Sequence, residues 1–171
     1  PTNPLGARAI YLKTNGVDMI ANWKGDLGFA DLSVGFVGNW TRSQKFKATP
    51  TSLDRECVGY FSVNCSFTGS MQPEFQTSTR FTLGFEKVDV SLLWRWMSKM
   101  DFEPQQFIDD GGDANSILPQ YRHISPKSYF DLATRFNVTD NLTLTATVTN
   151  LLDSKPTLVG STIGSTSFNS G

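Results

Sequence analysis

The chain has 171 residues, enough for one domain with a hydrophobic core. Charged residues make up 18% of it, against about 25% in typical soluble domains, and 15 basic against 16 acidic residues leave a net charge of -1. This balance excludes the basic surface of a nucleic-acid-binding protein. The longest apolar run, residues 9–12, is far shorter than the roughly 20 residues of a membrane-spanning helix.

Alternation of apolar and polar residues recurs along the chain and predicts β-strands, because the side chains of a strand point alternately to opposite faces. The predicted strands are residues 17–24, 28–41, 79–86, 88–96, 130–138 and 142–148. Residues 7–13 are expected to form the first half of the first strand, with Asn15-Gly16 as a bulge or a tight bend. A true turn at Asn15-Gly16 would make seven strands instead of six.

Short and long connections alternate between these predicted strands. Short turns are predicted at residues 25–27, 86–88 and 139–141, while residues 42–76, 101–128 and those after Asn150 form long loops. Tight turns at one rim and long loops at the other are typical of a transmembrane β-barrel. A meander in a soluble protein has no reason to place all its long loops at one end.

The two sides of the predicted strands differ in chemistry. The apolar sides carry Trp23, Trp40, Trp94 and Trp96 at or near strand ends, which is where the aromatic girdles of membrane barrels lie. The opposite sides carry ionised residues, which are costly in a dry core and cheap beside water. A soluble sheet with one wet side explains each strand equally well, but the loop asymmetry and the tryptophans favour a membrane.

Six or seven strands do not close a barrel, and open edges inside lipid are costly. The expected fold is therefore all-β: an arc of a larger transmembrane antiparallel β-barrel, or else one subunit of a composite barrel, with short periplasmic turns and long extracellular loops. Pro1 in place of Met favours the arc.

Several segments resemble the C-terminal third of the barrel of a TonB-dependent outer-membrane receptor. Residues 129–144 are similar to that family's penultimate hairpin, residues 150–156 (NLLDSKP) to its N-L-hydrophobic-D-x-x-P signature, and residues 16–18 (GVD) to its G-V-D/E segment. The resemblance covers nearly all of residues 1–171, as part of one barrel domain. The family's plug domain and its final strand are absent, and Pro1 in place of Met indicates a processed product or an internal fragment.

The resemblance implies an intact barrel of about 22 strands, in the outer membrane of a Gram-negative bacterium and surrounded by lipid and lipopolysaccharide. It implies a receptor that imports a scarce small ligand, such as a ferric siderophore, a vitamin or a glycan, driven by the TonB energy-coupling complex through the absent plug domain. The alternatives are a passive porin or surface barrel, and a soluble β-sandwich binding module. We expect no enzymatic activity and no cofactor, because the sequence offers no convincing catalytic set.

The first long loop contains the two cysteines of the chain, Cys57 and Cys65. Outside the cell they are expected to form a disulfide, because that compartment is oxidising; the alternative is two free thiols. Receptors contact their ligands through such loops. Tyr60 and Phe61 are therefore candidates to stack on a sugar or an aromatic chelator, or else they bury themselves under their own loop.

The second long loop holds the remaining candidate ligand contacts. Asp109, Asp110 and Asp113 offer carboxylates to Ca²⁺ or to a ligand, but the acidic residue about 12 positions on that an EF-hand requires is missing. An ordinary Asp- and Gly-rich turn is the simpler interpretation, and no metal site is predicted. The loop continues with an aromatic ring, a guanidinium and the only imidazole of the chain, which either contact ligand or simply pack: Tyr121, Arg122 and His123.

Overall fold

The structure of the protein is a computed structural model that describes residues 11–47, 54–63, 65, 71–103, 111, 113 and 117–159. The described strands, with one short 3-10 helix, are β1 (Tyr11–Asp26), β2 (Asp31–Lys47), β3 (Arg55–Glu56), β4 (Tyr60–Phe61), β5 (Phe75–Gly84), β6 (Val88–Met97), β7 (Met100–Phe102), η3 (Pro119–Tyr121), β8 (His123–Ile124), β9 (Lys127–Thr139) and β10 (Leu142–Val148). They form one large antiparallel sheet and one small sheet. The prediction of an all-β fold is confirmed for the described part of the chain.

The large sheet contains every long strand of the described residues, in the order β1-β2-β5-β6-β9-β10, with β3 paired to β2. All neighbours in it are antiparallel. These six long strands are the six that alternation predicts. The sheet is open, since β1 and β10 each have one neighbour among the described residues.

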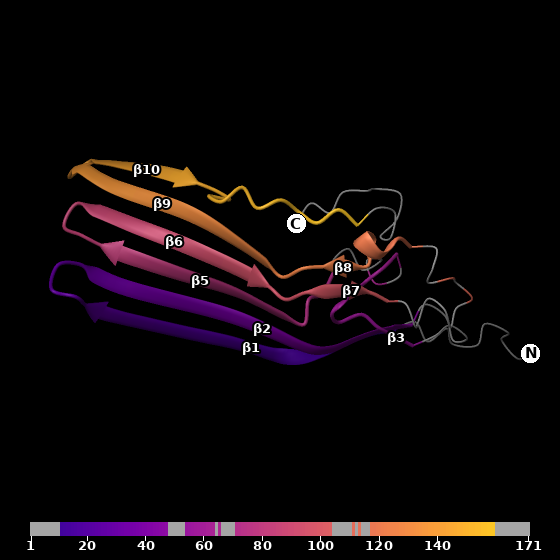
Figure 1. Ribbon diagram of the computed structural model, residues 1–171. Helices are drawn as coiled ribbons and strands as arrows, with labels where there is room; N and C mark the ends of the chain where they lie inside the picture. The colour runs from indigo at the N-terminus through magenta and orange to yellow at the C-terminus, as the bar shows by residue number, and fades with distance from the viewer. Residues whose placement is uncertain are drawn as a thin grey trace, which may run out of the picture.

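The turns of the large sheet gather at one end. Residues 27–30, 85–87 and 140–141 join the three hairpins, and Figure 1 shows these turns together at the left, with the longer connections at the opposite end. The first turn lies later than predicted, because β1 continues to Asp26. The Asp26 carboxylate accepts the N–H of Gly28 at 2.6 Å, and Gly28 has a φ of 84°, which glycine adopts without steric cost.

The first strand contains a bulge. The pairing of β1 with β2 shifts register between Asn15 and Gly16, and the strand continues without a turn. Gly16 packs so closely against β2 that an added Cβ would overlap the carbonyl oxygen of Trp40. Of the two predicted possibilities at Asn15-Gly16, the structure therefore contains the bulge, and the count of long strands stays at six.

Cross-strand register brings the apolar side chains of all long strands onto one side of the sheet, here called the apolar face. One continuous row runs through Trp23, Val34, Phe81, Leu92, Leu132 and Val148. Two residues further along the strands, towards the long connections, Trp94 and Phe130 lie opposite each other on the same face, and their rings stack with centroids 6.1 Å apart. Because residues opposite one another in a sheet share a face, the alternation within each strand becomes one surface across the sheet.

The opposite side, here called the polar face, carries amides, hydroxyls and charges. One row across it runs through Lys24, Ser33, Thr82, Ser91, Ala133 and Thr147. Polar groups of this face pair between strands. Arg95 Nη2 lies 3.0 Å from Asp131 Oδ2, and Asn39 Nδ2 donates to Asp18 Oδ1 at 2.7 Å.

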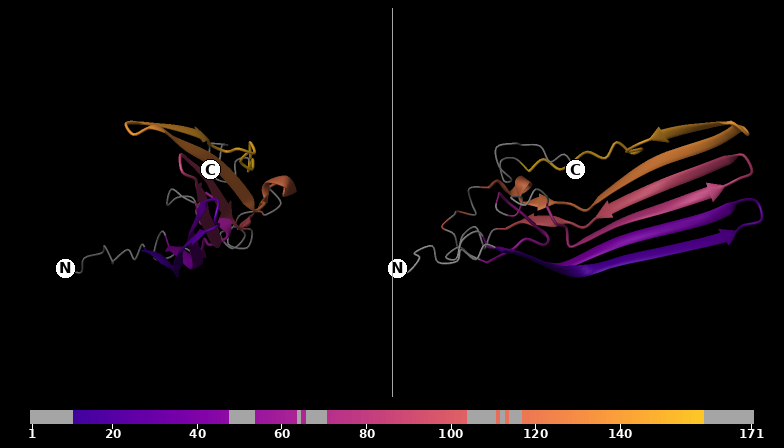
Figure 2. Two further views of the ribbon diagram at one scale, coloured as in Figure 1. Left: turned by 90° about the vertical axis from the view of Figure 1, so that its left-hand side faces the viewer. Right: turned by 180° about the vertical axis from the view of Figure 1, so that it is seen from behind.

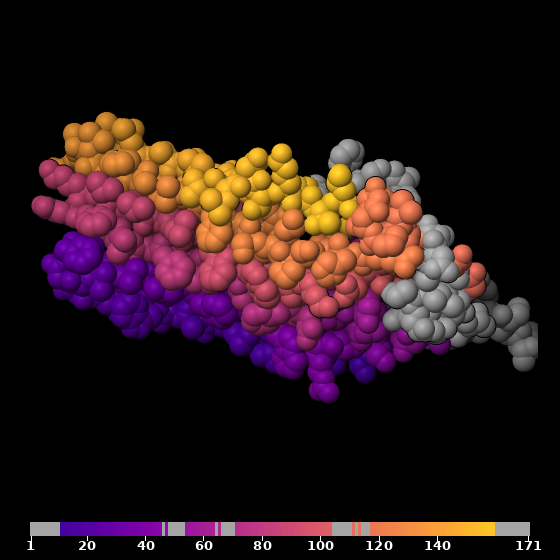
Figure 3. Space-filling view, in the orientation of Figure 1, coloured from indigo at the N-terminus to yellow at the C-terminus, as the bar shows by residue number. Residues whose placement is uncertain are grey.

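Neither face of the large sheet is covered by a second layer of the described residues. Figure 1 and the view from behind in Figure 2 show no strand or helix over the long strands. In the space-filling view of Figure 3 the long strands themselves form the visible surface. Trp23 is 54% exposed and Leu144 53%. A β-sandwich needs a second sheet against the apolar face, and the described residues supply none.

Two strands begin earlier than predicted. β5 starts at Phe75 and β9 at Lys127, each several residues ahead of its predicted start. The alternation at the start of β5 is not visible in the sequence, because Thr77 occupies the apolar face between Phe75 and Thr79. Polar residues therefore stand on both faces of this part of the strand.

After β10 the chain folds into a tight turn against β9. Asn150 has a φ of 52°, its side-chain oxygen accepts the Ser154 N–H at 2.9 Å, and its amide donates to the Ser154 carbonyl at 3.1 Å. The Asn150 N–H donates to Asp131 Oδ1 at 2.8 Å, and Ser154 Oγ donates to the Ser128 carbonyl at 3.0 Å. The first five residues of the NLLDSKP segment thus form a turn that is tied to β9 at both ends.

Candidate functional site

The long connections fold together into a lobe, defined here as the small sheet β4-β7-β8 with the residues packed on it. β4 pairs with β7 in parallel, and β7 pairs with β8 in antiparallel. The parallel pairing joins the connection that follows β2 to the one that follows β6. Figure 1 shows β7 and β8 at the end of the large sheet away from the short turns.

The lobe contains a small hydrophobic core. It consists of Phe61, Met100, Phe102, Ile124 and Val159, all buried. Phe61 has no exposed surface, and its ring meets that of Phe102 edge-on with centroids 6.0 Å apart. Phe61 is therefore a core residue and does not offer its ring to a ligand. Of the two roles predicted for Phe61, the structure therefore supports burial under its own loop.

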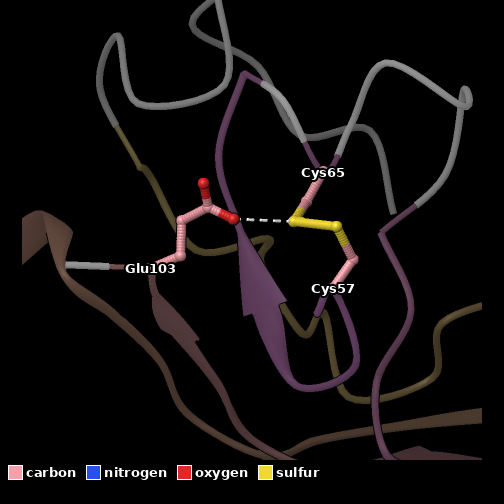
Figure 4. A group of neighbouring side chains, drawn as sticks. All are labelled: Cys57, Cys65 and Glu103. Atoms are coloured by element: carbon pink, nitrogen blue, oxygen red, sulfur yellow. Dashed lines mark hydrogen bonds between the residues drawn. A yellow bond between two sulfur atoms is a disulfide. The ribbon is translucent and has the colours of Figure 1, made fainter. Parts of the chain in front are cut away.

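A disulfide closes one side of the lobe. Cys57 and Cys65, the pair predicted to be bonded, are joined in the structure, with their Cα atoms 5.3 Å apart. Figure 4 shows the Glu103 carboxyl directed at this disulfide, with Oε2 2.8 Å from Cys65 Sγ. These three buried side chains are the one potential metal-ligand cluster among the described residues. Because both sulfurs are used in the disulfide, the cluster offers no thiolate to a metal.

Glu103 also forms a buried ion pair. Its Oε1 lies 2.7 Å from Arg55 Nη1, and the two side chains are 1% and 6% exposed respectively. Arg55 belongs to β3, which is paired to the large sheet, whereas Glu103 follows β7 of the lobe. The pair therefore fixes the lobe to the large sheet. Breaking a buried pair on one side is strongly destabilising, because the other charge stays buried.

The outer side of the small sheet carries an exposed polar row. Tyr60 lies opposite Asp101, and Asp101 lies opposite His123. His123 Nδ1 is 2.6 Å from Asp101 Oδ1, and Lys99 Nζ is 3.3 Å from Asp101 Oδ2. The hydrogen bond with His123 is the main cause that lowers the pKa of Asp101 below its ordinary value. Burial acts in the opposite direction, and the hydrogen bond and charge of Lys99 lower the pKa further. We call Tyr60, Lys99, Asp101 and His123 the exposed row.

The exposed row combines two predicted residues with two that sequence analysis missed. Tyr60 and His123 are candidates from different loops, and the small sheet brings them together on either side of Asp101. A signal for Lys99 and Asp101 existed in residues 99–103, where charged residues alternate with Met and Phe as in a strand. A phenol, a carboxylate, an imidazole and an ammonium side by side suit hydrogen bonding to a polar ligand.

The other candidate residues do not belong to the exposed row. Tyr121 ends the 3-10 helix η3, and Arg122 is half-buried and donates from Nε to the carbonyl of Ile117 at 2.7 Å. Arg122 thus packs its own loop, which is the alternative that the sequence left open. Asp113 is exposed, and Asp109 and Asp110 lie outside the described residues, as does most of the predicted Asp- and Gly-rich turn.

Comparison of the chain with protein-family models, with curated proteins and with solved structures gave no match. Within the described ranges, no helix has the length and apolar character needed to cross a membrane.

Proposed function

We propose that this chain is part of the wall of an outer-membrane β-barrel and that the whole protein is a TonB-dependent receptor importing a scarce small ligand. The carrying observation is the apolar face, which is continuous over six long strands and uncovered among the described residues, opposite a face of paired charges and amides. Apolar patches on soluble monomers rarely exceed a few hundred Å². Hydrocarbon on one side and a wet lumen on the other account for both faces.

Strand length and aromatic placement support this proposal. β5 and β6 have 10 residues each, and a tilted strand needs about 9–11 residues to cross a bilayer. Near the short turns, Phe136 lies on the apolar face opposite Val88, and near the long connections Trp96 packs edge-on against Phe75 at 6.0 Å. On the apolar face of β6, Val90 and Leu92 lie between these two aromatic groups, an arrangement that fits girdles at two interfaces.

The open edges support an arc of a larger barrel. In lipid, each unpaired backbone N–H or C=O costs several kcal/mol, so β1 and β10 need further strands beside them. The short turns would lie in the periplasm and the lobe outside the cell, where a disulfide persists. The exposed row would then face incoming ligand. Import and coupling to the TonB complex follow from the sequence resemblance.

Site-directed spin labelling of β6 tests the carrying observation. The two cysteines of the chain form the disulfide, so single cysteines at residues 90–95 can be labelled one at a time in the full-length protein in lipid vesicles. We expect labels at Val90, Leu92 and Trp94 to be accessible to oxygen, and labels at the positions between them to be accessible to a water-soluble nickel reagent. Uniform accessibility to the nickel reagent would contradict the proposal.

The importer role has its own test. The purified C-terminal domain of TonB is expected to bind the full-length protein, and to bind more tightly when ligand is present. A protein with lipid-exposed labels that never binds TonB would be a passive porin or surface barrel, the alternative within the membrane.

A further inference from the structure

A recess opens on the polar face of the large sheet, next to the end that carries the lobe. It has a volume of about 610 Å³, within the roughly 300–1,000 Å³ of small-molecule sites. Its walls come from four strands and from the turn after β10: Val37, Asn39, Gln76, Arg95, Tyr129 and Asn150 are among its lining residues. None of these residues belongs to the exposed row of the lobe.

Arg95 contacts two neighbouring side chains in this recess. Its Nη2 lies 3.0 and 3.3 Å from the two carboxylate oxygens of Asp131, and its guanidinium carbon lies 5.6 Å from the centre of the Tyr129 ring. Asp131 is fixed in turn by the N–H of Asn150 at 2.8 Å. A guanidinium held by a carboxylate and a ring is preorganised, which lowers the entropy cost of binding a ligand.

Several polar groups of the recess have no hydrogen-bond partner within the described part of the chain. They are the side-chain amide of Gln76, the hydroxyl of Tyr129, the hydroxyl of Ser78, and Nε and Nη1 of Arg95. Together they present donors and acceptors to the same space. By contrast, the Asn39 and Asn150 amides of the same recess are already bonded to neighbouring residues.

The recess has no net charge, because its one cation is paired with a carboxylate. Among the described residues that line it, Arg95 is the only Lys, Arg, Asp or Glu, and the adjacent Asp131 neutralises its charge. An anion would have to compete with Asp131, and a cation would meet the guanidinium. Val37, Met97 and the Tyr129 ring add apolar surface between the polar groups.

We propose that this recess binds a neutral saccharide. Sugars present hydroxyls that donate and accept, together with apolar C–H faces, and the recess offers the matching groups without net charge. This assignment rests on the proposed function in one respect only: the recess would face the lumen, just inside the lobe, and would hold a sugar on its way inward.

Binding of maltotriose to the full-length protein in detergent, measured by calorimetry, tests the proposal. Tyr129→Phe keeps the ring and removes the hydroxyl, and Gln76→Ala removes an exposed amide with no partner among the described residues. Each is expected to weaken binding about three- to tenfold, the effect of one lost hydrogen bond. Thr145→Ala, on the polar face near the short turn, is the matched control and should bind like the wild type.

Three results would overturn the saccharide site: no saturable binding of maltotriose, equal binding by all three variants, or tighter binding of citrate, which is an anion, than of maltotriose. The spin-label pattern of β6 separates the two proposals. Lipid-exposed labels without sugar binding contradict the recess alone, whereas sugar binding by a protein with water-exposed labels supports the recess and contradicts the membrane wall.

Discussion

At the residue scale, the Arg55–Glu103 pair links the lobe to the large sheet, and both side chains are buried. Glu103→Gln keeps the shape and removes the charge opposite Arg55. We expect it to destabilise the lobe by about 3–5 kcal/mol, the usual cost of breaking a buried pair from one side. Hydrogen exchange of the β7 amides measures this change.

A double variant separates charge from shape in the same pair. Arg55→Met with Glu103→Leu replaces both ions by apolar groups and should recover most of the lost stability. Glu86→Gln, at an exposed turn position, is the control and should have no effect on β7. A Glu103→Gln variant as stable as the wild type would show that the ion pair does not hold the lobe.

The second prediction at this scale concerns pH. The pKa of Asp101 is lowered in the folded lobe by His123 and Lys99. A carboxyl with a lowered folded pKa stabilises the fold above its unfolded pKa, and this contribution disappears as pH falls through the folded value. Lobe stability should therefore decline as pH falls below the ordinary aspartate value of 3.8.

Asp101→Asn should remove this part of the acid sensitivity and leave a flatter curve. Susceptibility of the lobe to an acid-active protease between pH 5 and about pH 2 provides the measurement. Parallel curves for Asp101→Asn and the wild type would contradict the role given to Asp101.

At the scale of single elements, β6 offers a matched pair of positions. Leu92 lies on the apolar face between Phe81 and Leu132, and its neighbour Leu93 lies on the polar face between Arg80 and Asp131. Leu92→Arg should destabilise the protein in a bilayer by about 2–4 kcal/mol, because it places a charge in hydrocarbon. Leu93→Arg should destabilise the protein much less, because its guanidinium would be hydrated by water and would lie beside the Asp131 carboxylate.

Urea unfolding of the two variants in lipid vesicles compares them directly, with identical chemistry at adjacent residues. Equal destabilisation at Leu92 and Leu93 would contradict the assignment of the two faces.

Long strands were predictable because seven or more residues repeat a period of two, and such a run differs from the 3.6-residue period of a helix. The alternation from Val88 to Trp96 alone defined β6 to within a residue. The lobe strands have two or three residues each, too few to show a period. Tyr60 and His123 meet through pairings with a third segment, and no local signal in either loop specifies that contact.

At the scale of the whole molecule, the two ends of the sheet should lie on opposite sides of the membrane. Lys99, 64% exposed in the lobe, and Asn141, exposed in a short turn, mark these ends. With the native cysteines bonded, a membrane-impermeant maleimide should label Lys99→Cys on intact cells. It should label Asn141→Cys only after the outer membrane is permeabilised. The reverse pattern would invert the proposed orientation, and labelling of both on intact cells would contradict a membrane wall.

The parallel pairing of β4 with β7 also bears on the order of assembly. Each long hairpin pairs two strands that are consecutive in sequence, so its pairing can start at the short turn and extend from there. Tyr60 and Asp101, by contrast, are separated in sequence by the whole β5–β6 hairpin. We therefore expect the lobe to close last, once β5 and β6 are aligned beside β2. A correctly formed lobe would then show that the long strands had already paired in the right order.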